Sequence, residues 1–157
     1  MKKIIALLSL VLLLLTGCSQ YKNVDLNDIK VSKVKMISAQ NIELQFKANV
    51  ENPTRTEFEV TGIEGLLYRN GAEFANLQLI EPATVPANFS GDVLLKCKFS
   101  LSDPLAALAL GLNIASLNSD DFTADLIVSV KGGALKKNFK YRDMPMSKVF
   151  KMFDIKL

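Results

Sequence analysis

Short runs of alternating apolar and polar residues restrict the fold of this chain more than any other feature. The clearest run extends from residue 42 to residue 50 and places five apolar residues on one face: Ile42, Leu44, Phe46, Ala48 and Val50. A period of two residues is typical of a β-strand with one buried and one solvated face. The run therefore predicts a strand of an antiparallel sheet.

The same period recurs between turn residues along most of the chain. Further strands are predicted at residues 29–38, 58–68, 73–80, 92–100, 122–131 and 135–142. In the first of these the phase of the alternation changes near Ser32, which predicts a β-bulge. Seven strands of this kind predict a mainly β domain in which two antiparallel sheets pack face to face.

Turn residues and one helix separate these strands. Asn52-Pro53 ends the clearest strand, because proline cannot donate to a ladder. Asn70-Gly71 predicts a tight hairpin, because both residues tolerate positive φ angles. Ser102 is placed to cap a helix with Pro104 in its first turn, so we expect a helix over residues 102–117.

The predicted helix is apolar on two sides. One stripe consists of Leu105, Leu108 and Leu112, and the other consists of Leu110, Ile114 and Leu117. A helix that is apolar on both sides is normally buried, so we expect it to plug the open end or edge of the sandwich. In the second interpretation one stripe stays accessible and contacts a partner, a lipid or the bilayer.

The N-terminus has the features of a secretory signal. Lys2 and Lys3 precede an apolar run, 4–15, that is too short to span a bilayer comfortably. Leu15-Thr16-Gly17-Cys18 resembles the lipobox of bacterial lipoproteins, which implies cleavage before Cys18 and attachment of acyl chains such as palmitate to it. The alternative is an uncleaved anchor. We therefore expect a signal peptide at 1–17, a lipidated cysteine and tether at 18–28, and the β domain at 29–157.

Composition excludes several classes of function. Loss of residues 1–17 lowers the net charge from +3 to +1, which gives no electrostatic argument for nucleic-acid binding. The chain has no histidine, so histidine-based catalytic triads and most zinc sites are excluded. We expect no enzyme activity, no metal and no cofactor. Cys97 alternates with two lysines, which predicts a buried, inert free thiol.

The C-terminal part of the sequence is basic. Lys136, Lys140 and Arg142 share one face of the last predicted strand. We expect a solvated edge that discourages strand pairing, and the alternative is a face that orients the domain on an anionic membrane. The tail at 147–157 is expected to form a short amphipathic helix.

Several of these segments occur in the order found in a known family. The run from Ile42 to Thr54, then 62–68, Asn70-Gly71 and Pro86-Ala87-Asn88 resemble the late embryogenesis abundant (LEA) type 2 family, also called the LEA14-like or WHy domain. The Asn52-Pro53 corner is the most specific piece, and Thr54 stands where the family pattern has asparagine. The resemblance implies an immunoglobulin- or fibronectin-III-like β-sandwich with one helix, a link to stress tolerance, and no established catalytic activity.

These observations predict a membrane-anchored, non-enzymatic lipoprotein of a bacterial cell envelope. Its LEA type 2-like domain is expected to bind an unknown protein, polymer or lipid partner or to protect against stress. The second hypothesis is a carrier or assembly factor that shelters an acyl chain between the sheets. Ser19 replaces the aspartate associated with inner-membrane retention, which favours the outer membrane.

Overall fold

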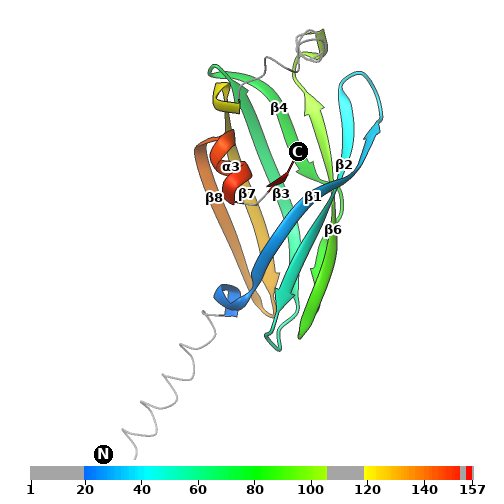
Figure 1. Ribbon diagram of the computed structural model, residues 1–157, viewed down its shortest axis with the longest axis vertical. Helices are drawn as coiled ribbons and strands as arrows, with labels where there is room; N and C mark the ends of the chain where they lie inside the picture. Colours follow the sequence, from blue (N-terminus) through cyan, green and yellow to red (C-terminus); the bar gives the residue numbers. More distant parts are fainter. Residues whose placement is uncertain (1–19, 106–118, 153–154, 157) are drawn as a thin grey trace, which may run out of the picture.

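The strands join into one continuous sheet that folds over into two layers (Figure 1). The computed structural model describes residues 20–105, 119–152 and 155–156. Its strands are β1 (Asp25–Met36), β2 (Asn41–Asn52), β3 (Phe58–Arg69), β4 (Ala72–Leu79), β5 (Ala83–Val85), β6 (Phe89–Leu101), β7 (Phe122–Gly132), β8 (Leu135–Pro145) and β9 (Ile155–Lys156). The other described elements are the 3-10 helices η2 (Gln20–Asn23) and η4 (Ser119–Asp121) and the helix α3 (Met146–Met152).

The strand order is β8-β7-β3-β4-β6-β2-β1-β9, and β5 pairs with β3. All pairs are antiparallel except β1 with β9. The sheet folds over where β4 meets β6, a junction that pairs residues 75–79 with residues 97–101 and is extended by backbone hydrogen bonds from Ile80 to Lys96 and from Ser102 to Phe74. One layer therefore contains β1, β2 and β6, and the other contains β3, β7 and β8 (Figure 1).

The predicted mainly β sandwich architecture is confirmed, but its strand count and connectivity differ from the prediction. The described residues form nine strands of one folded sheet, where the sequence predicted seven strands in two sheets. β5 and β9 were missed, because three and two residues are too few to show a period. The bulge near Ser32 is confirmed by a register shift between Val31 and Lys33.

The predicted hairpin after β3 is also confirmed. Asn70 and Gly71 have φ angles of 49° and 82°, as a tight turn between β3 and β4 requires. Of the predicted helix, the structure describes only the start, at Pro104 and Leu105, and residues 106–118 lie outside the described part. The predicted cap at Ser102 is wrong, because Asp103 Oδ1 accepts from the Leu105 amide at 3.0 Å and the Ser102 hydroxyl donates to Glu73 instead. In the tail, the expected helix is present as α3, and Ile155 and Lys156 form β9.

The residues expected to be a tether at 20–28 are instead structured. Gln20 to Asn23 form η2, and β1 begins at Asp25. The Tyr21 ring packs 5.0 Å from the Phe58 ring, centroid to centroid, and its hydroxyl donates a 3.1 Å hydrogen bond to the Leu135 carbonyl. These partners are distant in sequence, so the local pattern gave no sign of the docking.

Within the described residues no helix is long and apolar enough to cross a membrane.

The packed core lies at the end of the domain that carries η2, here called the η2 end. It consists of Ala48, Val50, Phe58, Ala83, Val85 and Val93. The β1–β2 and β3–β4 turns lie at the opposite end, here called the far end (Figure 1). The η2 end is therefore the firmly closed part of the sandwich.

Candidate binding surface

The inner face of the folded sheet is a continuous apolar surface. Residues opposite each other in antiparallel strands point to the same side, so the register fixes which side chains share a row. Near the far end one row contains Met36, Ile42, Phe99, Leu77, Leu126 and Tyr141. The next row toward the η2 end contains Val34, Leu44, Cys97, Leu79, Ile63, Val128 and Phe139.

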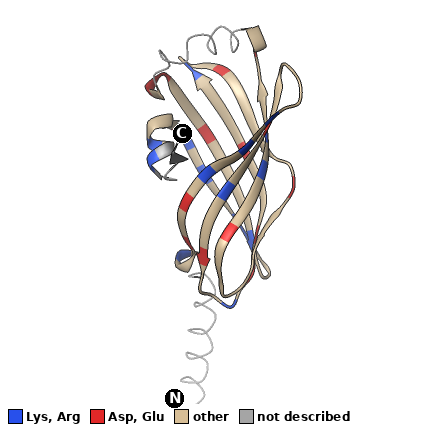
Figure 2. Cartoon of the chain, turned by 45° about the vertical axis from the view of Figure 1, so that its right-hand side comes forward, with Lys and Arg blue, Asp and Glu red and all other residues tan. Residues whose placement is uncertain are grey.

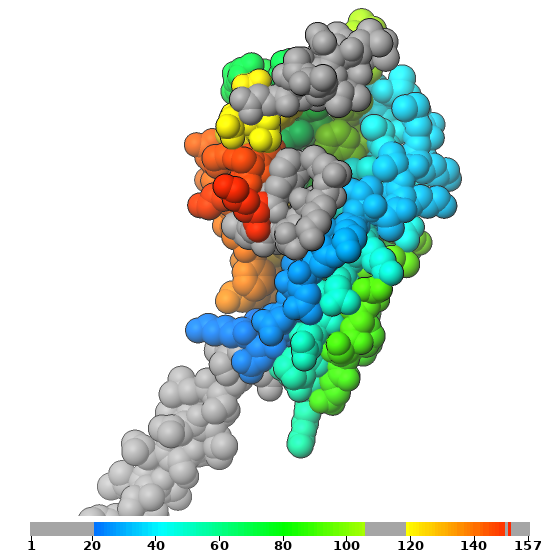
Figure 3. Space-filling model, in the orientation of Figure 1, coloured from blue at the N-terminus to red at the C-terminus, as the bar shows by residue number. Residues whose placement is uncertain are grey.

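Burial along this face changes from one end to the other. At the η2 end, Ala48 of β2 and Val93 of β6 are 2% and 8% exposed. On β1, Val34 is 62% exposed and Met36 is 75% exposed, and Ile37 in the adjoining turn is 55% exposed. Figure 3 shows β1 and the β1–β2 hairpin at the molecular surface of this side. These three residues, here called the β1 strip, form an accessible apolar surface.

Buried residues also occur outside this core: Ala75 and Cys97 at the fold junction, Met144 on β8 and Val149 on α3. α3 packs against β7, β8 and η4. Cys97 is only 1% exposed, and burial raises the pKa of its thiol to about 11. Cys97 is therefore the buried free thiol that the sequence predicts.

Arg69 places a cation at the far end among aromatic rings. Its guanidinium lies 5.9 Å from the centroid of the Phe122 ring, which packs edge-on against Phe74 at 5.5 Å. The buried Nε atom has no hydrogen-bond partner within the described part of the chain. Sequence reasoning missed Arg69, because a strand arginine usually faces solvent.

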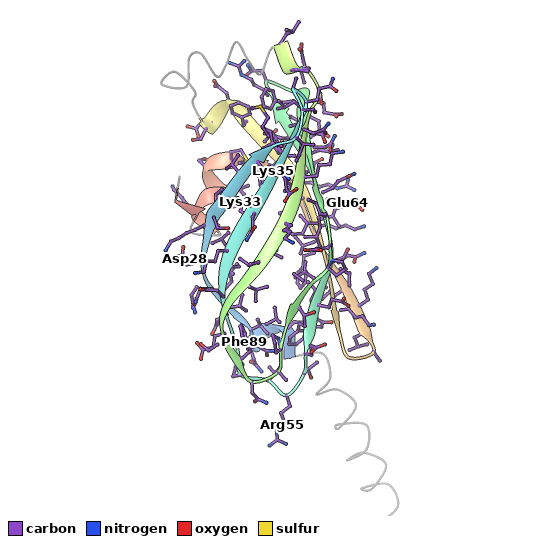
Figure 4. All side chains as sticks on the ribbon, turned by 90° about the vertical axis from the view of Figure 1, so that its right-hand side faces the viewer. Asp28, Lys33, Lys35, Arg55, Glu64 and Phe89 are labelled. Carbon is purple, nitrogen blue, oxygen red and sulfur yellow. The ribbon has the colours of Figure 1, made fainter. Side chains whose placement is uncertain are left out.

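The outer face of the same strands is charged and solvated. Lys47 pairs with Asp92 at 2.7 Å, and Lys96 pairs with Glu81 at 2.7 Å. The hydrogen bond from Lys47, assisted by Asn49, lowers the pKa of Asp92. Figure 2 shows positive and negative residues interspersed along these strands, and Figure 4 shows Glu64 pointing away from the sandwich on the other layer. Within the described residues, the outer face of these strands is therefore mainly charged, whereas the inner face is mainly apolar.

The Asn52-Pro53 corner locks the η2 end. Asn52 is fully buried, and its Nδ2 donates to the carbonyls of Thr56 at 2.9 Å and Pro86 at 2.7 Å. Its Oδ1 accepts from the backbone N of Thr54 at 3.1 Å and from the Thr54 hydroxyl at 2.7 Å. Asn52 thus joins the β2–β3 corner to the loop before β6, which gives this residue a structural role.

Two surface depressions are described. One, of about 310 Å³, lies on the outer face across β3, β4, β7 and β8, and its polar lining includes Glu64, Asp125, Lys140 and Arg142. The other, of about 400 Å³, lies at the η2 end and is lined by Arg55, Thr56, Glu57, Glu59, Lys131 and Gly133. Among the residues the structure describes, no cluster of three or more acidic or cysteine ligands is placed to hold a metal.

The structure describes only part of the predicted site. Leu15, Thr16, Gly17 and Cys18 lie outside the described residues, as do the helix residues Leu108, Leu110, Leu112, Ile114 and Leu117. Leu105 is described, and it is 79% exposed at the far end. The β1 strip was not singled out from the sequence, because alternation identifies inner residues without telling which of them stay uncovered.

No protein-family model and no curated protein matches this chain. Among solved structures, a protein from Archaeoglobus fulgidus has a TM-score of 0.48 at 12% identity, over 75% of this chain and 97% of that one. The yeast GGA1 GAE domain has a TM-score of 0.32 at 9% identity, over 75% and 84%. A LEA protein has a TM-score of 0.32 at 14% identity, over 92% and 88%. At these values we draw no functional conclusion from the likeness.

Proposed function

We propose that this chain is a non-enzymatic lipoprotein of the bacterial envelope whose β domain binds an apolar partner on the far part of its inner face. The observation that carries the proposal is the β1 strip, in which Val34 and Met36 are largely exposed beside a continuous apolar sheet face. Exposed apolar patches of this kind mark interaction surfaces in soluble domains. The resemblance to the LEA type 2 family adds stress protection as the setting for such binding.

The membrane anchor rests on the lipobox-like sequence ending at Cys18. Several acyl chains on one residue hold a protein to a bilayer far more firmly than a single chain. The outer membrane is the preferred location, because Ser19 is not the residue associated with inner-membrane retention.

A carrier of an acyl chain is the second candidate function. The observation that favours it is the same inner face, whose half-buried rows carry leucine, isoleucine, valine and phenylalanine side chains from both layers. Such a surface matches an aliphatic chain as well as it matches a protein partner. The two candidates differ in whether the purified protein retains a lipid beyond those on Cys18.

Mass spectrometry of the full chain, expressed in a bacterial host and extracted from its membranes, tests the anchor and separates the candidates. We expect a denatured mass equal to residues 18–157 plus acyl groups, and an unprocessed, unacylated mass for Cys18→Ala. An unmodified wild-type mass would refute the anchor.

The native mass separates the carrier from the protein-binding domain. If the native mass exceeds the denatured mass by that of a lipid, and this excess is lost in Val34→Asp but kept in the outer-face control Lys33→Glu, the carrier is favoured over a protein partner.

A further inference from the structure

The turn that joins β7 to β8 combines exposed apolar residues with lysines. This segment, Lys131 to Lys137, is here called the β7–β8 tip. Gly133, Ala134 and Leu135 are exposed at its end, with Leu135 at 49%. Lys131, Lys136 and Lys137 flank them, and no acidic residue occurs between positions 126 and 142. An apolar tip between lysines suits the interface of an anionic bilayer, where the tip enters the headgroup region and the ammonium groups meet phosphates.

The N-terminal segment is attached to this same tip. The Tyr21 hydroxyl bonds the Leu135 carbonyl, and the Tyr21 ring contacts the rings of Phe58 and Phe139. The Lys137 ammonium lies 4.9 Å from the Phe139 centroid and 6.0 Å from that of Tyr21. Lys22, which follows Tyr21, is exposed and adds a further cation.

The chain between the anchor and this docked residue is very short. Cys18 and Tyr21 are three residues apart, a span of about 10 Å when fully extended. A domain held by so short a segment has to stay at the membrane surface. The part of the domain nearest the anchor is the η2 end, which carries the β7–β8 tip and Arg55, shown pointing outward from that end in Figure 4.

The distribution of charge between the two ends of the domain favours the same orientation. The far end carries Glu73, Asp103, Asp120 and Asp121 against the cations Lys35 and Arg69, so its acidic excess is repelled by an anionic membrane. At the η2 end, Glu57 and Glu59 lie beside Lys131, and Asp25 lies opposite Glu51 on β1 and β2. These four acids lie outside the lysine-flanked tip, whose own segment carries three lysines and no acid.

We propose that the β7–β8 tip, with Tyr21 and Lys22, is a membrane-docking surface that seats the η2 end on an anionic bilayer and directs the far end away from it. This inference rests on the proposed anchor at Cys18. It also orients the β1 strip relative to the membrane, because the strip then faces the aqueous compartment or an opposing membrane.

A single tryptophan reports this orientation, because the chain contains none. Full-length protein carrying Leu135→Trp or the control Ile37→Trp, residues with similar exposure at opposite ends, is reconstituted into vesicles of phosphatidylcholine with and without phosphatidylglycerol. With brominated lipid as quencher, we expect quenching at position 135 at least about twice that at position 37 in anionic vesicles. Lys22→Glu and Lys136→Glu should each lower, at least about fivefold, the ratio of molecules with the tip in contact with the bilayer to molecules with the tip in water, while the protein stays vesicle-bound.

Flotation of the vesicles separates failure of the docking surface from failure of the anchor. Protein that floats but shows equal quenching at both positions, or no quenching at position 135, would overturn the docking surface and leave the anchor intact. Protein that floats with neither vesicle type would overturn both proposals. Equal thermal unfolding of the variants confirms that the substitutions leave the fold unchanged.

Discussion

Asn52→Leu is expected to lower the free energy of unfolding by about 4 kcal/mol. The leucine removes four hydrogen bonds, which leaves the Pro86 carbonyl and the Thr54 amide without the Asn52 partner, while the Thr56 carbonyl keeps the 3.2 Å bond from the Thr54 hydroxyl. Each unsatisfied buried group costs about 1–3 kcal/mol. Leucine is similar to asparagine in size, so the loss reflects hydrogen bonding more than a change of packing. Urea unfolding followed by far-UV circular dichroism measures the change.

Asn49→Leu is the matched control on the same strand. Asn49 is half-buried on the outer face, where its amide donates to Asp92 at 3.0 Å and its Oδ1 accepts from Asn27 at 3.1 Å. Loss of these solvent-accessible bonds is expected to cost about 1 kcal/mol or less. Similar losses for the two variants would contradict the structural role assigned to the Asn52-Pro53 corner.

Gly132→Ala is expected to destabilise the domain by about 3 kcal/mol. A Cβ at this position would lie 2.6 Å from two carbons of the Phe58 ring and 3.2 Å from the Tyr21 hydroxyl. Phe58 is only 4% exposed and packed in the core, so its ring cannot move away without disturbing its neighbours. Forcing an extra methyl group into a packed core costs about 1–3 kcal/mol. Differential scanning calorimetry should show a clearly lower Tm.

Gly62→Ala provides the comparison in β3, the strand that pairs with β7. Its Cβ would lie 3.6 Å from the Ser129 Cβ, an ordinary van der Waals distance. We expect a change within about 1 kcal/mol, because no neighbour has to move. If Gly132→Ala were as mild as Gly62→Ala, the close packing of β7 on Phe58 and Tyr21 would be wrong.

Local pattern was sufficient to predict the strands that alternate regularly. The inner faces of β2 and β6 follow the predicted alternation, and Leu44 lies opposite Cys97. The hairpin at Asn70-Gly71 was predictable because its turn requires positive φ angles. The start of β1 was not predictable in the same way, because Asp25 and Asp28 interrupt any apolar alternation and gain their order by pairing with Glu51 and Asn49 of β2.

Features that depend on distant contacts could not be read from the sequence. Tyr21 docks on Leu135, 114 residues away, which no local period reveals. β5 exists because Ala83 and Val85 fill the core beside β3 between two prolines. The exposure of Val34 and the burial of Val93 follow from where the layers close, although both residues lie at equivalent inner positions of their strands.

The two proposals together define how the domain is oriented on its membrane. In this account the η2 end is closed, basic at the β7–β8 tip and tied to the proposed anchor, whereas the far end carries more acidic than basic residues and the exposed β1 strip. A domain whose two ends differ in this way holds its binding surface away from its own membrane. The partner would then approach from the aqueous side.

Thiol labelling of the native protein tests most directly whether the inner face is closed at the η2 end and accessible at the far end. Cys97 is an internal reference, because it is 1% exposed and its pKa is raised to about 11. In full-length protein with Cys18 acylated, we expect Val34→Cys to react with maleimide at least about a hundredfold faster than Val93→Cys, which should be as slow as Cys97. Equal rates at positions 34 and 93 would contradict this description of the inner face.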